Sequence, residues 1–67
     1  ISIYPNPCAD ILTIDGAESG EIVLTSIDGK VQIRKAYEAG SSQDLSMLSS
    51  GFYLLSLNGQ ILKLRKL

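Results

Sequence analysis

Histidine and tryptophan are absent from this 67-residue chain, and cysteine occurs once, at Cys8. Without histidine, no serine–histidine or cysteine–histidine nucleophile pair can form, and the commonest general base is missing. One cysteine cannot complete a usual zinc site by itself, and the sequence contains no Walker loop or dinucleotide fingerprint. We therefore expect no enzymatic activity, no metal and no cofactor, and we interpret Cys8 as a small buried apolar residue.

Charge is also scarce, and it is unevenly placed. The net charge is −1, and all seven acidic residues lie at or before Asp44, whereas only Lys63, Arg65 and Lys66 are charged after it. Binding to nucleic acid normally requires a larger basic surface, so we expect none. The longest nearly apolar run, residues 52–57, is far too short to cross a bilayer as a helix, so we expect no transmembrane segment.

The length suffices for one domain, residues 1–67, with a thin hydrophobic core. About 45% of the residues are hydrophobic, but only three tyrosines and one phenylalanine are aromatic. A domain of this size is marginally stable alone, and an upstream domain or self-association would add stability. Because the first residue is Ile1 rather than methionine, we expect the chain to be a fragment of a longer protein.

Short runs of alternating apolar and polar residues dominate the chain, which is typical of half-buried strands. Asp28-Gly29 and Asn58-Gly59 each separate two such runs and suit a type I′ turn, so we predict hairpins over residues 20–37 and 51–66. Residues 44–50 could hold a strand bridge and one helical turn. The pattern predicts an all-β fold, a small immunoglobulin-like sandwich of two antiparallel sheets with about seven short strands. The predicted core comprises Ile3, Leu12, Ile14, Ile22, Leu24, Val31, Ile33, Leu45, Leu48, Tyr53, Leu55, Leu57, Leu62 and Leu64.

Short motifs stand near both ends of the chain. Tyr4, Pro5, Asn6 and Pro7 form a stiff segment, because proline fixes φ and restricts the residue before it. The first strand should end or bend there, and Asp10-Ile11-Leu12-Thr13-Ile14 follows.

Two further motifs occur in the second half. Asp44-Leu45-Ser46 precedes Gly51-Phe52-Tyr53, where Gly51 would supply backbone freedom and Tyr53 a buried aromatic anchor. Core packing alone would also explain both residues. The tail contains Lys63, Arg65 and Lys66 among leucines, with the first two expected to face solvent. It could be an edge strand protected by charge, a docking strip, or both.

In order and spacing, these motifs resemble the C-terminal sorting domain of the type IX secretion system, in its short, type A form (the Por secretion system C-terminal domain family). Ile27-Asp28-Gly29-Lys30-Val31 resembles the central hairpin of that family. The resemblance extends from Tyr4 to Leu67, and Cys8 stands where the family has a small residue such as alanine or serine.

The resemblance implies that the chain is a secretion signal, a substrate rather than a catalyst. It implies a bacterial parent protein of the Bacteroidetes type that reaches the periplasm and is recognised by the outer-membrane translocon and shuttle proteins of type IX secretion. A sortase-like cysteine protease would then usually cut upstream of Ile1 and join the parent to surface lipopolysaccharide. The sorting-motif residues are Tyr4, Pro5, Asn6, Pro7, Gly51 and Tyr53, and the translocon-docking residues are Lys63, Arg65 and Lys66.

The sequence also leaves open an alternative function and the association of the domain with a second copy of itself. The chain could instead be an immunoglobulin-like accessory module that binds carbohydrate or spaces domains. Sugar binding usually requires exposed aromatic rings, and we expect Tyr4 and Tyr37 to be the only candidates, since Phe52 and Tyr53 are assigned to a core strand. A leucine-rich last strand would present a free hydrogen-bonding edge, so we also predict a weak homodimer.

Overall fold

The computed structural model describes residues 1–67, which form seven strands and no helix. The strands are β1 (Ser2–Tyr4), β2 (Ile11–Asp15), β3 (Gly20–Ser26), β4 (Val31–Tyr37), β5 (Ser42–Asp44), β6 (Gly51–Leu57) and β7 (Gln60–Lys66). No segment forms a helix long and apolar enough to cross a membrane.

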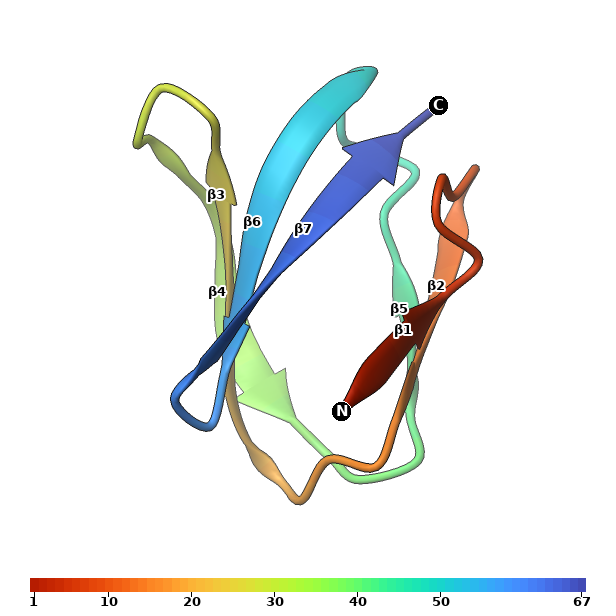
Figure 1. Cartoon of the computed structure of the whole chain (residues 1–67), viewed down its shortest axis with the longest axis vertical. Coiled ribbons are helices and arrows are strands. Elements are labelled where there is room, and N and C mark those ends of the chain that lie inside the picture. Colours follow the sequence, from red (N-terminus) through yellow and green to blue (C-terminus); the bar gives the residue numbers. More distant parts are fainter.

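The strands build two antiparallel sheets that face each other across the core (Figure 1). One sheet has the order β1-β2-β5 and the other the order β4-β3-β6-β7. The chain crosses between the sheets after β2, β4 and β5, the Greek-key type of connection found in immunoglobulin-like sandwiches. The predicted all-β sandwich of about seven strands is therefore confirmed.

Both predicted hairpins form, but only one has the predicted turn. Between β6 and β7, Asn58 and Gly59 have φ values of 50° and 80°, which suits a type I′ turn. Between β3 and β4 the amide of Gly29 donates to the carbonyl of Ser26, and only Gly29 has a positive φ, of 92°. The prediction of a type I′ turn at Asp28-Gly29 was therefore wrong. The loop is one residue longer than a two-residue type I′ loop. Its glycine follows a turn whose central residues, Ile27 and Asp28, do not have a positive φ.

The core lies between the sheets and is made mainly of the alternate residues of each strand. Its twelve buried apolar residues are Cys8, Leu12, Ile14, Ile22, Leu24, Tyr37, Leu45, Leu48, Tyr53, Leu55, Leu57 and Leu64. Ile3, Ile33 and Leu62 pack against it and are partly buried. Most of the predicted core is thus confirmed, and the predicted burial of Cys8 is confirmed as well.

Val31 is the exception, since 46% of it is exposed. The register between β3 and β4 shifts after Leu24, so that Ile33 pairs with Leu24 whereas Val31 pairs with Thr25. This irregularity places Val31 and Ile33 on opposite faces of the sheet, although they are two residues apart in sequence. Alternation alone assigned both of them to the core, and for Val31 that prediction was wrong.

The segment between β5 and β6 contains a turn rather than a helix. The amide of Leu48 donates to the carbonyl of Leu45 at 3.0 Å, and no helical turn is formed before Gly51. The turn carries both leucines into the core. The chain then passes from the three-stranded sheet into β6 of the four-stranded sheet.

Candidate functional site

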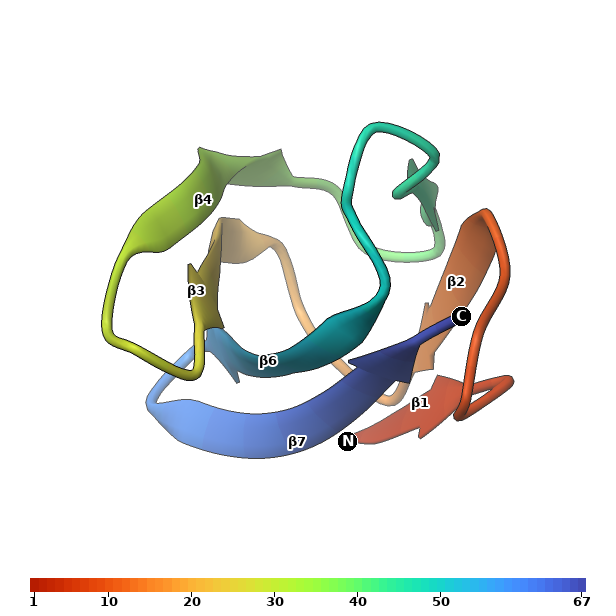
Figure 2. The ribbon, with the colours of Figure 1, turned by 90° about the horizontal axis from the view of Figure 1, so that it is seen from above.

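The motifs of the sequence lie together around the second half of β7. On one side, residues 51–53 of β6 pair with residues 64–66 of β7. On the other side β7 is the last strand of its sheet, and the segment between β1 and β2 contacts it there. Figure 2 shows this segment beside the C-terminal end of β7. Three parts of the chain that are far apart in sequence thus make one site.

Asn6 and Cys8 occupy the outer edge of β7. The Asn6 side chain donates from Nδ2 to the carbonyl of Lys63 at 3.0 Å and accepts from the amide of Arg65 at Oδ1, at 3.1 Å. The amide of Cys8 donates to the carbonyl of Arg65 at 2.9 Å, and the carbonyl of Cys8 accepts from the amide of Leu67 at 2.8 Å. Three outward-pointing backbone groups of β7 and the amide of Leu67 just after it are therefore satisfied by this segment, as a further strand would satisfy them.

This contact corrects one premise of the sequence analysis. The last strand was expected to present a free hydrogen-bonding edge, but the edge is occupied over its C-terminal half. The uncovered part of β7 lies near its beginning, at Gln60 and Ile61, because Asn6 and Cys8 reach only from Lys63 onward.

Tyr4, Pro5 and Pro7 are neighbours of Asn6 in the sequence and are exposed to solvent. Tyr4 ends β1, which confirms that the first strand stops at the prolines. The Tyr4-Pro5 and Asn6-Pro7 peptide bonds are both cis. Of the four motif residues, only Asn6 forms side-chain hydrogen bonds with β7.

Gly51 and Tyr53 lie at the beginning of β6 and stabilise its conformation there. Gly51 has a φ of 148°, a conformation that side chains rarely adopt, and a Cβ placed there would meet no other atom. The backbone conformation rather than a lack of space therefore favours glycine. Tyr53 is 7% exposed, and its hydroxyl donates to the carbonyl of Ser49 at 2.6 Å. A tyrosine that bonds the backbone just upstream of this strand is the tyrosine corner of immunoglobulin-like sandwiches.

The three basic residues of the tail differ in their surroundings. Lys63 and Arg65 are exposed on the outer face, as predicted, and both lie over the ring of Phe52. The Lys63 Nζ is 4.8 Å from the ring centroid, and the Arg65 guanidinium carbon is 5.9 Å from it. A cation within about 6 Å of a ring face is attracted by the π electrons.

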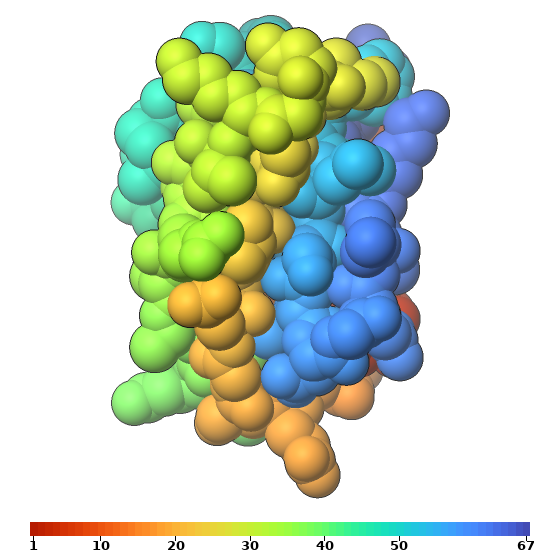
Figure 3. Space-filling model, turned by 90° about the vertical axis from the view of Figure 1, so that its left-hand side faces the viewer, coloured from red at the N-terminus to blue at the C-terminus, as the bar shows by residue number.

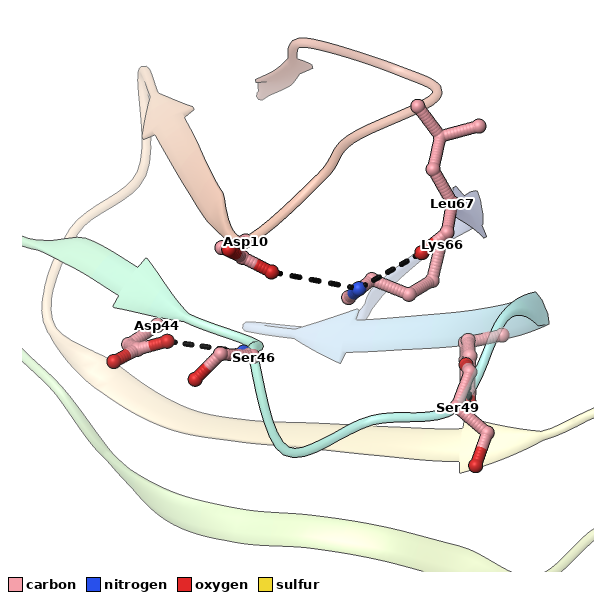
Figure 4. A network of polar contacts seen from close by, with 7 residues as sticks. Asp10, Asp44, Ser46, Ser49, Lys66 and Leu67 are labelled. Atoms are coloured by element: carbon pink, nitrogen blue, oxygen red, sulfur yellow. Dashed lines mark hydrogen bonds and ion pairs between the residues drawn. The ribbon is translucent and has the colours of Figure 1, made fainter.

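Lys66 points to the opposite face and is only 6% exposed. Its Nζ lies 3.7 Å from Oδ1 of Asp10 and donates to the main-chain oxygen of Leu67 at 2.9 Å (Figure 4). Because Lys66 is buried and paired, its charge is not free for a partner in the way expected of a docking strip. From the sequence it was grouped with Lys63 and Arg65 as a docking residue, whereas the alternation of β7 places it on the same face as Leu64.

Two aromatic residues were also assigned to the wrong environment. Tyr37 was a candidate for an exposed ring, but it is 2% exposed and its hydroxyl donates to the carbonyl of Ile14 at 3.4 Å. Phe52 was placed in the core strand, but it is 44% exposed. It lies on the outer face because it alternates with the buried Tyr53. Tyr4 is exposed, as expected.

Two carboxyl groups have a lowered pKa: Asp28 in the turn between β3 and β4, and Asp44 at the end of β5. A hydrogen bond from the backbone of Ser46 lowers the pKa of Asp44, and one from the hydroxyl of Ser26 lowers that of Asp28. Each bond stabilises the charged form of the carboxylate. Burial raises the pKa of the Cys8 thiol, which keeps it protonated and unreactive.

Three partners that complete the site were not predicted from the sequence: Asp10, Ser49 and the backbone of Cys8. Nothing in their own positions singles them out, because each acts through a contact with a residue far along the chain or through its backbone. Phe52 is different, since its place in the alternation of β6 already indicates the outer face. No group of metal-binding side chains gathers anywhere in the structure.

The fold and the site together define a small antiparallel β-sandwich module in which the segment between β1 and β2 is joined to the last strand at one edge. The family described as "Secretion system C-terminal sorting domain" matches residues 2–67, and the chain belongs to this family. It is a non-catalytic sorting domain for secretion by the type IX, or Por, system, which directs a secreted protein through the outer membrane. Comparisons with curated proteins and with solved structures gave no match.

Proposed function

We propose that this domain is the C-terminal export signal of a longer protein and that the outer-membrane translocon and shuttle proteins of type IX secretion recognise it. The observation that carries the proposal is the convergence of the motifs. Tyr4, Pro5, Asn6 and Pro7 lie beside Lys63 and Arg65 only because the domain is folded. A receptor that contacts this edge would therefore distinguish a folded sorting domain from an unfolded chain.

The family membership supports the same proposal, because the match covers nearly the whole chain rather than one motif. Within the site, Lys63 and Arg65 are the exposed charges that a translocon could contact, whereas Lys66 supports the strand from inside. Tyr53 and Gly51 act indirectly by holding the beginning of β6 in place beside Arg65 and Lys66.

Removal of the domain completes the proposed route. A sortase-like cysteine protease would cut upstream of Ile1 and join the parent protein to surface lipopolysaccharide. The two ends of the chain lie towards opposite ends of the long axis of the molecule (Figure 1). A protease at the N-terminal side and a translocon at the C-terminal end of β7 would therefore act at separate places on the domain.

Grafting the chain onto a neutral periplasmic reporter tests the export step. We expect the reporter to reach the medium or cell surface in a type IX-competent strain and to stay in the periplasm when residues 63–67 are deleted. Fractionation and immunoblotting of the reporter measure both outcomes. Retention of the intact fusion in the periplasm of the competent strain would contradict the proposal.

Removal and anchoring are tested with the same fusion. In a strain with an active sortase, the exported reporter should be shortened by this domain and carry lipopolysaccharide. In a strain without the sortase it should keep the domain. A full-length reporter at the surface of both strains would show that this copy is retained, and the cleavage step would be abandoned.

A further inference from the structure

The outer face of the four-stranded sheet carries an apolar surface that nothing in the chain covers. Figure 3 shows this side of the molecule, on which β4, β3, β6 and β7 lie side by side in this order from left to right. On the β6–β7 half, Phe52, Leu54 and Ile61 are 44%, 42% and 68% exposed. Lys63 and Arg65 stand over the ring of Phe52. We call these five residues the aromatic–cationic face.

The two cations of this face have no acidic partner. The structure contains one ion pair, and it joins Lys66 to Asp10. Neither Lys63 nor Arg65 pairs with a carboxylate, and no acidic residue follows Asp44 in the sequence. Their charges are therefore held in place over an aromatic ring but are not neutralised within the domain.

The face is also backed by the hydrophobic core. Behind it, Tyr53 and Leu55 are buried in the core, and the hydroxyl of Tyr53 is bonded to Ser49. At its end, an open hollow is lined in part by Phe52, Arg65 and Leu67. A partner side chain can enter this hollow without the sheet having to rearrange, and a preorganised surface loses little entropy on binding.

From these observations we propose that the aromatic–cationic face docks onto an acidic and apolar surface of a partner protein of the secretion machinery. The proposal rests on the proposed function and adds the face that is read and the chemistry of its partner. Apolar contacts with Phe52, Leu54 and Ile61 would supply the buried centre of the interface. Carboxylates of the partner would pair with Lys63 and Arg65, which favours encounter and orientation.

The charges favour a protein over a lipid surface or a second copy of the chain. Recognition of anionic lipid headgroups typically uses clusters of about four to eight basic residues, whereas this face has two. A symmetric contact between two copies of the face would bring the basic residues of both copies together without an acid to separate them.

A matched pair of variants of the reporter fusion tests the proposal. The face variant carries Phe52→Ser, Lys63→Gln and Arg65→Gln. The control carries Val31→Ser, Lys30→Gln and Arg34→Gln, which removes one exposed apolar residue and two cations from the β3–β4 hairpin of the same sheet. Circular dichroism and thermal unfolding of both purified fusions check that the domain still folds.

We expect the control to be exported as the parent fusion is, and the folded face variant to be exported about tenfold less, with accumulation in the periplasm. Normal export of the folded face variant would overturn the docking face and leave the proposed function standing. Failure of the unaltered fusion to be exported would overturn the proposed function itself. If the face variant unfolds, Lys63→Glu with Arg65→Glu replaces it, because both side chains are exposed.

Site-specific photocrosslinking in cells identifies the occupant. A photoreactive residue at Leu54 should crosslink to an outer-membrane protein through a segment that contains acidic residues, whereas one at Val31 should not. Crosslinking to lipopolysaccharide or to a second copy of the domain would overturn the choice of a protein partner. The same choice would be overturned if the unaltered domain bound phosphatidylglycerol vesicles and the face variant did not. Absence of any crosslink at Leu54 would count against the docking face.

Discussion

Tyr53 and Phe52 are neighbours in sequence with opposite roles. Tyr53 is buried and bonds to Ser49, while Phe52 faces solvent under two cations. Tyr53→Ala should cost about 3–5 kcal/mol of unfolding free energy, which would leave so small a domain largely unfolded. Tyr53→Phe should cost about 1–2 kcal/mol, because only the hydrogen bond is lost. Urea unfolding followed by circular dichroism measures both.

Phe52→Ala is the control for these two variants. It should change the free energy of unfolding by less than about 1 kcal/mol, because the ring is 44% exposed and lies outside the hydrophobic core. A loss at Phe52 as large as that at Tyr53 would contradict the assignment of the two faces.

Lys66 is a second residue for which the direction of the side chain decides how much a substitution lowers the stability of the domain. Lys66→Gln should destabilise the domain by about 1–2 kcal/mol, because the side chain is buried and lies beside Asp10. Lys63→Gln should change stability by less than about 0.5 kcal/mol, because that side chain is exposed. From the sequence, Lys66 was assigned to the docking residues together with Lys63 and Arg65, so its contribution to folding follows from its burial in the structure.

A double-mutant cycle with Asp10→Asn separates the ion pair from packing. Asp10 is 67% exposed, so solvent weakens the pair, and the coupling energy should be only about 0.5–1 kcal/mol. Thermal or urea unfolding of the four proteins gives this value. A coupling of zero would assign the whole effect of Lys66 to its packing and to its bond with Leu67.

At the scale of elements, Asn6 replaces a missing strand along β7. Asn6→Ala removes the bonds to Lys63 and Arg65, so the amide of Arg65 should exchange its hydrogen with solvent much faster. Hydrogen-exchange NMR measures this amide directly. Gln60→Ala is the control, because it removes an exposed amide side chain at the other end of β7. Equal protection of Arg65 in both variants would show that Asn6 does not seal the edge.

The turns at Asp28 and Asp44 should make the fold sensitive to acid. Both carboxyl groups have a pKa below the ordinary aspartate value in the folded domain, and this value is regained on unfolding. The folded state therefore binds fewer protons, so these groups stabilise it above about pH 4 and cease to do so as the pH falls through their folded pKa values.

The double variant Asp28→Asn, Asp44→Asn tests this expectation. Its unfolding free energy should depend less on pH below about pH 5 than that of the unaltered domain. Urea unfolding across this range gives the comparison. The same acid dependence in both proteins would mean that other carboxyl groups cause it.

At the scale of the whole molecule, the covered edge of β7 leaves less of the strand free for self-association. The predicted homodimer has less free edge available than the sequence suggested, because Asn6 and Cys8 cover β7 from Lys63 onward. At equal concentration, Asn6→Ala should therefore associate more strongly than the unaltered domain, since it exposes backbone groups of the strand. Sedimentation velocity measures this, with Gln60→Ala as the control. Equal association in all three proteins would exclude the β7 edge as the contact.

The part of the fold that could be predicted from the sequence is the part that depends on the local alternation of apolar and polar residues. Period-two patterns and turn residues are local properties, so the strands, the two hairpins and most of the core could be assigned before the structure was known. Val31 was assigned wrongly because a bulge shifts the register after Leu24, and nothing in the neighbouring residues announces it. Tyr37 was assigned wrongly because an aromatic residue suits a core as well as a surface.

The sequence by itself therefore determined the kind of fold, the family and the motif residues, because patterning and spacing along the chain carry that information. Only the tertiary structure decided which of these residues act together. Asn6 and Arg65 are far apart along the chain, and their hydrogen bond exists because the sandwich brings the segment after β1 against the last strand. The same packing buries Lys66 beside Asp10 and leaves Lys63 and Arg65 on the outer face, since the direction of a side chain depends on which sheet surface the strand turns to the core.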